Sequence, residues 1–542
     1  MRIRPHLALD SYKVDHKPQY PEHTELVYSN FTPRSAVHAN MPEGFDDKVV
    51  NFGLQGMIMD FFIGTWNREF FQRDRDTVVA EYQRRMDTFL GKGAVDCSHI
   101  GELHDLGYLP LRIKAIPEGE RVNIKVPLFT VVNTLPQFFW LTNYVETIMS
   151  NEGWKSITIA TIAYEYRRIL NKYVELTGSD KGFADFQIHD FSLRGLNGVH
   201  SGAKDGAAHL VAAGYGTDTL PAIDYLEDFY GANAETELIG CSVPATEHSV
   251  MCMGGMDTEI ETYRRLITEV YPTGIVSIVS DTWDFWKVIT EYTVELKDEI
   301  LARKPNALGQ SKVVIRPDSG DPVQIIAGLR VAPENSSASD LSYDEYDVIK
   351  VEGKYFKFGI NYCEYDGWPL DYFLGDEVPE HVVMGAVECL WNVFGGTTND
   401  KGYRTLDSHI GLIYGDSITL ARCEQILSRL MCKGFAADNI VFGVGSFTYQ
   451  YLTRDTFGMA MKATYGVVDG VPRELEKDPK TGDGIKKSAK GLLRVEKEGD
   501  NFVLYDQQTP EQEQQGILQV VFEDGVMYNR TTLSAIRSKL KQ

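Results

Sequence analysis

A repeated unit of strand, polar end and helix is the feature that most constrains what this chain can fold into. From about residue 183 onward, short apolar segments are each followed by polar or glycine-rich residues and then by a helical pattern. Successive segments lie roughly 30 to 40 residues apart, which is the length that one βα unit occupies. The segments that we predict to be strands are Phe186–His189, Glu237–Gly240, Ile275–Ser280, Val313–Ile315, Ile410–Tyr414 and Ile440–Phe442.

The segments between these strands show the 3.6-residue period of an amphipathic helix. The clearest example is the set Leu420, Cys423, Ile426, Leu427 and Leu430. Strands that alternate with helices build a parallel sheet, and ligands bind at the carboxyl ends of its strands. We therefore predict a parallel α/β barrel with its site at those ends. An open doubly wound sheet is the alternative.

Both ends of the chain show a different pattern, the two-residue period of antiparallel strands. In the N-terminal part it covers Pro110–Ala115, Arg121–Val126 and Leu128–Asn133. In the C-terminal part, Gly516–Tyr528 is typical of a hairpin with an Asp-Gly turn, and a short final helix follows. We expect this tail to rejoin the N-terminal sheet. The predicted domains are a β-rich domain of residues 1–150 with 466–542 and a barrel domain of residues 151–465.

The interval between Pro322 and Ile410 is too long for one βα unit, which predicts an inserted segment at about residues 325–403. Its first part, Ala332–Pro379, is rich in Asp, Glu, Tyr and Ser, and we expect it on the rim of the barrel. We predict that Glu388–Arg404 is a long loop or lid. Glu476–Lys490 combines lysines with Gly and Pro and is predicted to be mobile.

The overall charge limits the partners of the chain. At 542 residues and a formal net charge of -23, most of its surface repels nucleic acid and anionic membranes. An anionic substrate would therefore need a local basic pocket. No apolar run reaches the ~18 residues of a membrane span, and the first seven residues lack the apolar core of a signal peptide. We expect a cytoplasmic protein.

The cysteines form no C-x-x-C pair, and their number is odd. Because most have apolar neighbours, we predict reduced thiols in the core. No zinc motif, Walker A loop or G-x-G-x-x-G fingerprint is found in the sequence. The seven positions are Cys97, Cys241, Cys252, Cys363, Cys389, Cys423 and Cys432.

The segment Lys312–Pro322 changes in one step from a buried strand to groups that bind ligands. Arg316 offers a fixed cationic fork and Asp318 an acceptor for sugar hydroxyls. Ser319 and Gly320 offer backbone N–H groups that a phosphate can approach. The alternative is an Arg-Asp ion pair that closes an ordinary turn.

Two further positions have both a functional and an ordinary interpretation. His248 follows a proline turn and lies beside Glu247, so it could act as a nucleophile or proton carrier, or be a hydrogen-bonded loop residue. Asp218 precedes an apolar helix that begins near Leu220, so it could accept from a substrate amide or cap that helix.

A ring and a glycine-rich turn complete the candidate site. Phe191 could be a stacking platform for an aromatic ring or a core residue. Gly443-Val-Gly-Ser446, with Arg454 further along, would suit a phosphate. Taken together, these residues predict a pocket for a ribose, phosphates and a flat ring.

At these same positions the sequence resembles the nicotinamide phosphoribosyltransferase family, over most of the chain outside residues 325–403. Asp10–Lys13 and Trp140–Asn143 match as well. The chain departs from the family pattern at Leu193, where an aromatic residue is frequent, and at Gly445-Ser446-Phe447, where the glycine run is often longer. The motifs that carry the resemblance, in order, are His189–Gly195, Gly216–Thr219, Ser242–Ser249, Val279–Asp281, Ile315–Gly320, Tyr414–Asp416 and Leu452–Asp455.

The resemblance implies a type II phosphoribosyltransferase fold, in which a barrel-like α/β domain joins a β-rich domain built from both termini. It implies a head-to-tail homodimer with shared active sites. The implied reaction condenses nicotinamide with 5-phosphoribosyl 1-pyrophosphate to nicotinamide mononucleotide and pyrophosphate, in NAD salvage. Mg²⁺ is the implied cofactor and ATP the implied co-substrate, with ATP hydrolysis coupled through a phosphohistidine at His248.

The resemblance also implies residue roles. For the pyridine they are Phe191, Tyr12 of the partner subunit, Asp218 as acceptor from the carboxamide, and Ser277. Arg194, His248 and Arg316 would hold the pyrophosphate, and Asp318, Gly415 and Asp416 would hold the ribose. Ser446 and Arg454 would hold the 5′-phosphate. Further residues that would bind the pyrophosphate or the ribose phosphate are Gly445, Arg34, Lys13 and Lys462. The catalytic set is His248, Asp281, Asp318 and Glu247, in which Glu247 or Asp281 would orient the ring of His248.

The chemistry of the residues agrees with these roles. Leaving-group charge must be neutralised as the bond to pyrophosphate breaks, and Arg, Lys and Mg²⁺ do this. A carboxylate at Asp218 favours an amide over nicotinate, because two anions ~4 Å apart at an effective dielectric of ~20 repel by about 4 kcal/mol.

Three alternatives remain open at this point. Nicotinate phosphoribosyltransferase shares the fold. A glycoside hydrolase could use Asp281 and Asp318 as its carboxylate pair, although it would leave the arginines without a purpose. A non-catalytic nucleotide-binding protein would leave His248 idle.

Overall fold

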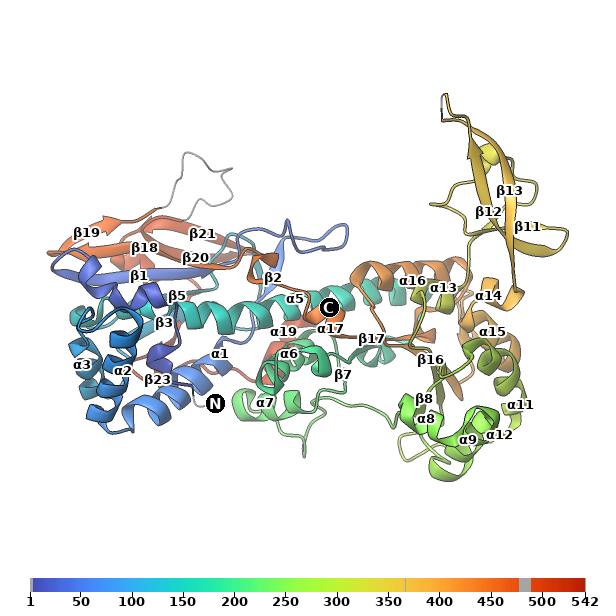
Figure 1. Ribbon diagram of the computed structural model, residues 1–542, viewed down its shortest axis with the longest axis horizontal. Helices are drawn as coiled ribbons and strands as arrows, with labels where there is room; N and C mark the ends of the chain where they lie inside the picture. Colours follow the sequence, from blue (N-terminus) through green and yellow to red (C-terminus); the bar gives the residue numbers. More distant parts are fainter. Residues whose placement is uncertain (1–2, 366, 477–488, 542) are drawn as a thin grey trace.

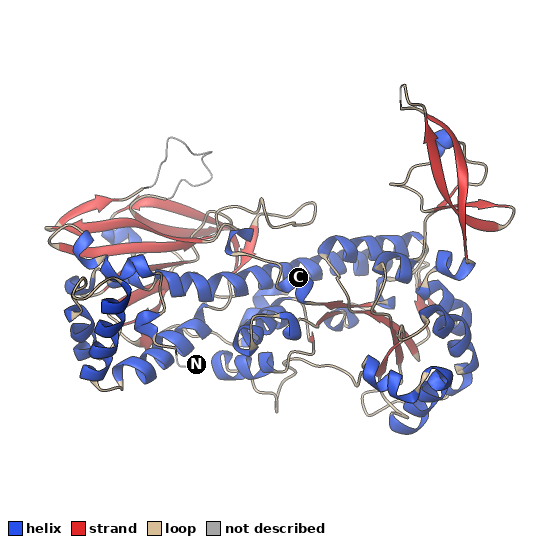
Figure 2. Cartoon of the chain, viewed as in Figure 1, coloured by secondary structure: helices blue, strands red, loops and turns tan. Residues whose placement is uncertain are grey.

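The computed structural model describes residues 3–365, 367–476 and 489–541. The molecule is elongated, with an antiparallel sheet and its helices at one end, a parallel α/β region at the other, and a β-arm that projects beside the latter (Figure 1). Helices surround the parallel strands, whereas the antiparallel sheet has one face covered mainly by strands (Figure 2). Most of the segment predicted to be mobile, Glu476–Lys490, lies outside the described residues.

The antiparallel end, called here the terminal sheet, combines both ends of the chain. β1 lies inside the sheet and pairs with β18 and β5, so that Thr24 is opposite Val468. The predicted antiparallel strands and C-terminal hairpin are thereby confirmed. In order across the sheet, the strands are β19 (Val471–Glu474), β18 (Ala460–Val468), β1 (Thr24–Thr32), β5 (Phe129–Asn133), β3 (Leu111–Ala115), β22 (Gln519–Glu523) and β23 (Val526–Met527).

One predicted strand pairs elsewhere, since β4 joins β2 in a separate two-stranded sheet. The core beneath the terminal sheet is aromatic, and the rings of Phe31 and Phe129 stack at 4.9 Å. Asp74 begins α2 by accepting a hydrogen bond from the N–H of Thr77. The elements around the sheet are β2 (Lys48–Val50), β4 (Arg121–Asn123), α1 (Leu54–Met57), α2 (Arg75–Phe89), α3 (Ser98–Leu106), α4 (Leu141–Tyr144), β20 (Leu492–Glu498) and β21 (Asn501–Gln508).

The other end contains a six-stranded sheet in which every pair of neighbours is parallel. Single parallel bridges, Gly216 to Cys241 and Ala245 to Ser277, tie the segment 241–245 to both edge strands. This segment therefore closes the sheet into a barrel-like ring, as predicted, and the open doubly wound alternative is wrong. In order, the strands are β7 (Gly216–Thr217), β6 (Ile188–Asp190), β17 (Val441–Val444), β16 (Ile410–Tyr414), β9 (Val313–Arg316) and β8 (Val276–Val279).

The strand predicted at Glu237–Gly240 is wrong, because the chain is irregular there and only Cys241 bridges to a neighbour. In its place, β7 contributes two residues. An irregular closing segment has few backbone hydrogen bonds of its own, so side chains must hold it.

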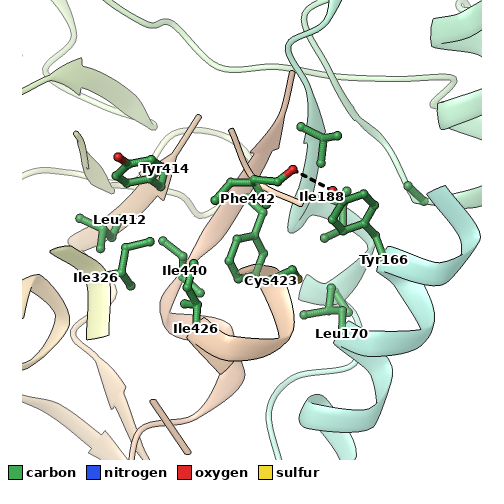
Figure 3. Close-up of a cluster of buried hydrophobic side chains, with 14 of the residues drawn as sticks. Tyr166, Leu170, Ile188, Ile326, Leu412, Tyr414, Cys423, Ile426, Ile440 and Phe442 are labelled. Carbon is green, nitrogen blue, oxygen red and sulfur yellow. Dashed lines mark hydrogen bonds between the residues drawn. The ribbon is translucent and has the colours of Figure 1, made fainter. Parts of the chain in front are cut away.

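The barrel core is formed by strands that are buried on both sides and by helices packed around them. α16 (Leu420–Cys432) buries Leu420, Cys423, Ile426, Leu427 and Leu430, as the periodicity predicts. Figure 3 shows Cys423 and Ile426 among Phe442, Ile440 and Leu170. Burial of each large aliphatic side chain contributes about 1.5–3 kcal/mol. Further helices of the barrel are α6 (Val199–Ala212), α7 (Pro221–Tyr230), α8 (His248–Gly254), α9 (Glu259–Arg265), α13 (Pro322–Ala327) and α17 (Ser446–Tyr449).

The inserted segment forms the β-arm, with a small core of its own around Ile349 and Phe358 (Figure 1). The prediction of a long loop or lid at Glu388–Arg404 is wrong. Ala386, Leu390 and Phe394 are buried against the barrel at helical spacing, so this stretch is a helix that reaches into the core, followed by a short hairpin. The elements are β10 (Val331–Ala332), β11 (Val348–Val351), β12 (Lys354–Tyr362), β13 (Pro369–Val378), α14 (Glu380–Met384), α15 (Ala386–Phe394), β14 (Gly396–Thr398) and β15 (Arg404–Leu406).

The final helix does not rejoin the N-terminal sheet. α19 (Leu533–Leu540) buries Leu533 and Ile536 in the barrel core, and Arg537 donates to the carbonyl of Leu210 at the end of α6. Only β22 and β23 of the tail belong to the terminal sheet. The domain boundaries at residues 150 and 466 stay a prediction, and β18 spans residue 466.

A single long helix, α5 (Glu146–Thr177), runs along both ends of the molecule (Figure 1). Ile157 belongs to the core of the terminal sheet, whereas Ile159 and the buried residues after it belong to the barrel core. Across the described ranges, no helix combines the length and apolarity that a membrane crossing needs.

All seven cysteines are free thiols, as predicted. Their placement in the core is correct for Cys97, Cys389 and Cys423 but wrong for Cys252 and Cys432, which are exposed. Both exposed residues lie on amphipathic helices, where apolar neighbours along the sequence do not ensure burial.

Candidate active site

Polar side chains gather at one edge of the barrel because its strands are parallel and their carboxyl ends meet there. Every strand of the six-stranded sheet contributes a residue that the sequence singles out. These are Phe191 after β6, Asp218 after β7, Asp281 after β8, Arg316 and Asp318 at the end of β9, Gly415 and Asp416 after β16, and Gly445 and Ser446 after β17.

The ring of Phe191 lies against backbone that only glycine permits. A Cβ on Gly415 would lie 2.8 Å from its Cε2, and a Cβ on Gly443 would overlap the ring. On another side the ring contacts His189, with centroids 4.8 Å apart. Phe191 is therefore fixed at the mouth of the barrel, where the residue roles implied by the sequence resemblance place a stacking platform.

Asp218 is held by side chains from two different segments. Its Oδ1 accepts hydrogen bonds from His189 Nε2 at 2.9 Å and from Ser242 Oγ at 2.6 Å. Burial would raise the pKa of this carboxyl, but the hydrogen bond and charge of His189, the Ser242 hydroxyl and the charge of Arg316 lower it below its ordinary value. The group is therefore an ionised acceptor. The capping alternative is wrong, since α7 begins after Leu220 without a side-chain cap.

Ser277 carries a buried hydroxyl for which no hydrogen-bond partner exists among the described residues. Its backbone pairs with the closing segment, through the carbonyl of Pro244 and the N–H of Thr246. An unpaired buried hydroxyl costs free energy, so its place on β8 near the barrel mouth agrees with a group that meets a ligand.

His248 is the first residue of α8, and its Nε2 lies 3.3 Å from Asp281 Oδ1. The imidazole is 48% exposed, whereas the carboxylate is only 7% exposed. A buried carboxylate that holds one ring nitrogen fixes the tautomer and leaves the other nitrogen available. Of the two carboxylates that sequence reasoning considers, Asp281 contacts the ring, while Glu247 accepts from the hydroxyl of Ser249.

Arg316 does not form the Arg-Asp ion pair that the sequence left open as the alternative for this segment. Its guanidinium donates to the carbonyl of Thr246 at 2.5 Å, its Nε is buried without a partner, and it makes no salt bridge within the described part of the chain. Burial raises the pKa of Asp318, and the charges of Asp281 and Asp416 add to this effect, while Arg316 and His248 oppose it. These groups thus form one electrostatic cluster.

The turn after β17 lies against the loop that carries Arg194. A Cβ on Gly195 would overlap the side chain of Ser446, so the two segments touch. Arg194 itself is exposed. A phosphate between this arginine and the turn would meet one guanidinium and the backbone around Gly445.

Other predicted phosphate ligands lie toward the terminal sheet. Arg34 donates from Nε to the carbonyl of Gly458 at 2.7 Å. Burial, followed by the neighbouring charge of Arg454, lowers the pKa of Arg34. Lys462 is exposed on β18, opposite Asn30 of β1. Asp455 lies 3.8 Å from Arg454 and its charge partly offsets the effect on Arg34, but two arginines beside a single carboxylate leave net positive charge that would favour an anion.

Tyr12 and Lys13 are not brought to the barrel mouth of their own chain. They lie in the short helix Ser11–Asp15, which contacts α4 beside the terminal sheet. Lys13 is buried and pairs with Glu146 at 2.8 Å, so its charge is already used. Tyr12 is 61% exposed. Their roles in binding stay predictions.

Three positions that contact candidate site residues were missed by sequence reasoning, namely His189, Ser242 and Thr246. His189 precedes Phe191 by two residues, so the two-residue period of a strand places both on one face. That signal was present in the sequence. Ser242 and Thr246 act through the closing segment, whose pairing with β7 and β8 no local pattern reveals.

No group of three or more His, Cys, Asp or Glu residues in the described ranges is arranged to hold a metal ion. The carboxylates of Asp281, Asp318 and Asp416 are nonetheless oxygen donors of the type that Mg²⁺ prefers. A magnesium ion bound chiefly by phosphate oxygens, with one or two of these carboxylates, would fit this mouth.

Comparison with known proteins agrees with the geometry. The family described as "Nicotinate phosphoribosyltransferase (NAPRTase) family" matches residues 186–526, which include the whole barrel mouth. The chain belongs to the nicotinate phosphoribosyltransferase family. A second match, "Nicotinamide phosphoribosyltransferase, N-terminal domain", covers residues 6–113. The glycoside hydrolase alternative is therefore wrong, and the resemblance seen in the sequence is confirmed.

Two relatives in this family span the whole chain. The "Nicotinamide phosphoribosyltransferase" of Acinetobacter baylyi is 54% identical and aligns over 100% of this chain and 98% of its own length. The protein of the same name from Xanthomonas campestris pv. campestris is 31% identical over 98% of this chain and 97% of its own length.

Two solved structures share the fold. A nicotinate-nucleotide pyrophosphorylase from Pyrococcus furiosus superposes with a TM-score of 0.54 at 11% identity, covering 99% of this chain and 95% of its own. The human nicotinic acid phosphoribosyltransferase gives a TM-score of 0.50 at 12% identity, covering 98% and 92%. They confirm the predicted barrel-like α/β fold.

Proposed function

We propose that this chain is a nicotinamide phosphoribosyltransferase, which condenses nicotinamide with 5-phosphoribosyl 1-pyrophosphate to nicotinamide mononucleotide and pyrophosphate in NAD salvage. The observation that carries the proposal is the ionised Asp218 beside the ring of Phe191. Its carboxylate accepts from an amide N–H₂ and repels a second carboxylate by about 4 kcal/mol at ~4 Å in an effective dielectric of ~20. Nicotinamide therefore suits the site better than nicotinate.

Other residues of the barrel mouth would bind the pyrophosphate, the ribose and the pyridine ring. Arg316 and Arg194 would neutralise the pyrophosphate as its bond to the anomeric carbon breaks, and Asp318 and Asp416 would hold the ribose hydroxyls. Phe191 would keep the pyridine nitrogen in line with the anomeric carbon, because it is fixed by glycine backbone on one side and by His189 on another.

Mg²⁺ is part of the proposal. When bound, it would supply further positive charge to the leaving pyrophosphate. The carboxylates of the mouth that could reach it are those of Asp281, Asp318 and Asp416. Burial and, after it, the charges of Asp281 and Asp416 raise the pKa of Asp318, and a cation would relieve the repulsion among the three groups.

A direct comparison of two substrates tests the proposed function. The purified protein, with phosphoribosyl pyrophosphate and Mg²⁺, is assayed with nicotinamide and with nicotinate in parallel. We expect kcat/KM to favour nicotinamide by at least ~100-fold, which corresponds to most of the electrostatic difference. A preference for nicotinate would overturn the proposal in favour of nicotinate phosphoribosyltransferase.

ATP coupling through His248 is a second part of the proposal. With the hydrogen on Nε2 donated to Asp281, the lone pair on Nδ1 could attack the γ-phosphorus of ATP, forming a P–N bond and releasing ADP. Water would later cleave the P–N bond and release phosphate. The exposed ring and the buried carboxylate support this role.

We predict that His248→Ala abolishes the stimulation by ATP while retaining more of the ATP-independent synthesis. Steady-state rates with and without ATP, together with ADP release, measure the effect. Asp281→Asn is the companion variant, because it retains the ring but alters its tautomer control. An equal loss of both rates in His248→Ala would contradict a phosphohistidine.

A homodimer and a cytoplasmic location complete the proposal. Tyr12 is exposed and lies beside the terminal sheet, away from the Phe191 of its own chain, which supports a site completed by Tyr12 of the partner subunit. Seven free cysteines support a reducing compartment.

A further inference from the structure

The carboxylate of Asp218 is held by one oxygen only. Oδ1 accepts both hydrogen bonds, from His189 and Ser242, whereas Oδ2 accepts none from any residue that the structure describes. The last torsion of an aspartate is broad and nearly two-fold, so an unheld carboxylate would turn easily. Two donors on a single oxygen select one orientation and leave the second oxygen directed elsewhere.

The two donors belong to different parts of the barrel. His189 is buried on β6, one strand away from the end of β7 that carries Asp218. Ser242 lies in the closing segment 241–245, and its Oγ is also 3.5 Å from His189 Nε2. The backbone N–H of Asp218 is tied to the carbonyl of Asp190 at 2.9 Å. The carboxylate is thus fixed from three directions.

We propose that His189 and Ser242 are positioning residues that set the amide selectivity of the site, by keeping Asp218 in one orientation with Oδ2 free for the substrate carboxamide. The inference rests on the proposed function, since it concerns the same acceptor. Neither residue needs to touch the reacting atoms.

Charge supports the same conclusion. The hydrogen bonds from His189 and Ser242 and the charge of Arg316 together outweigh burial and lower the pKa of Asp218. Loss of the two donors removes three of the four main effects that oppose burial, namely both hydrogen bonds and the charge of His189, so the pKa of Asp218 would rise. A carboxyl that takes up a proton no longer repels nicotinate, so loss of the donors would weaken discrimination as well as affinity.

A matched pair of variants isolates the hydrogen bond. His189→Gln and His189→Leu both remove the imidazole and its contact with Phe191, but only Gln places an N–H near the position of Nε2. We expect His189→Leu to raise the KM for nicotinamide about 10-fold, to leave kcat within about twofold, and to lower the preference for nicotinamide over nicotinate about 10-fold, as loss of a charge-assisted hydrogen bond implies. His189→Gln should recover most of both effects.

Ser242→Ala provides a second, independent measurement, since Ser242 is exposed and its removal leaves the core intact. We expect Ser242→Ala to raise the KM for nicotinamide and to lower the preference over nicotinate, as His189→Leu does, but by smaller factors. Unfolding transitions of all variants show whether they fold. If His189→Leu does not fold, Ser242→Ala alone decides.

Equal values for Gln and Leu at position 189, or a loss confined to kcat, would overturn the positioning role. A Ser242→Ala protein with unchanged KM and unchanged selectivity would overturn the contribution of the closing segment. If the unmodified protein does not use nicotinamide at all, the proposed function fails. If it does and the variants match it, only this inference fails.

Discussion

The barrel mouth and the surroundings of the terminal sheet differ in how their buried charged side chains are paired. In the terminal sheet, charges are paired within the chain: Lys114 with Glu513 at 3.0 Å, and Lys13 with Glu146 at 2.8 Å. In the barrel mouth, the Nε of Arg316 and the hydroxyl of Ser277 are buried and have no partner among the residues that the structure describes. Buried polar atoms without a described partner also occur near the terminal sheet, for example at Tyr28 and Trp140. The difference therefore lies in the charges, since Arg316 makes no salt bridge within the described residues, and an unpaired buried charge is costly unless a ligand compensates it.

The largest expected effect tests the unpaired arginine. Arg316→Ala should lower kcat/KM for phosphoribosyl pyrophosphate about 10³-fold, because a preorganised charge at the leaving group is lost. Its stability should hardly change, since the side chain donates only to the carbonyl of Thr246. Steady-state kinetics and thermal unfolding measure the two quantities.

Arg112→Ala is the control for that experiment. Arg112 pairs with Glu523 across β3 and β22 of the terminal sheet. We expect unchanged kinetics and a stability loss within about 1 kcal/mol, as for a half-exposed ion pair. If both arginine variants lowered kcat/KM alike, the contrast between the two ends would be wrong.

A smaller effect is expected from the buried pair in the terminal sheet. Lys114→Met leaves the carboxylate of Glu513 buried without its cation, which should cost about 3 kcal/mol in the free energy of unfolding. The paired replacement Lys114→Met with Glu513→Leu should recover much of that loss. Urea denaturation at constant pH provides the measurement, and kcat of the folded protein should not change.

The smallest expected effect is a partial recovery of activity when two inactive variants are mixed, which tests whether Tyr12 of one subunit completes the barrel mouth of the other. Tyr12→Ala and Asp218→Ala chains, each inactive alone, should regain about a quarter of the normal activity when mixed and allowed to exchange. Half of the dimers would then be mixed, and each mixed dimer would have one intact site. Mixing Asp218→Ala with Arg316→Ala, both in the barrel, should restore nothing. Equal recovery in both mixtures, or in neither, would contradict a shared site.

Much of the barrel was predictable because strands buried on both faces leave a recognisable run of β-branched residues, as in Val313–Ile315. Charged residues after such runs could be assigned to one mouth, since parallel strands end at the same edge. The closing segment could not be predicted, because Cys241 and Ala245 make single bridges and lack a strand pattern.

Long-range pairing also limits how much of the candidate site could be predicted from the sequence. Arg316, Asp318 and Asp218 were predictable from local sequence, but the hold of Ser242 on Asp218 depends on ring closure, which is a long-range property. The pairing of Lys13 with Glu146 also joins residues far apart in the sequence. Helix α15 was missed although its buried residues lie at helical spacing, because the whole interval was assigned to the insertion.

Helix α5 has a consequence for assembly. Its one continuous backbone is embedded in both cores, so the two ends of the molecule cannot swing relative to each other without breaking helical hydrogen bonds. The span from Tyr12 to the barrel mouth is therefore set in each chain during folding, before any second chain arrives. In a dimer of two such chains, helix α5 of each protomer would already have fixed the spacing between that protomer's Tyr12 and its barrel mouth.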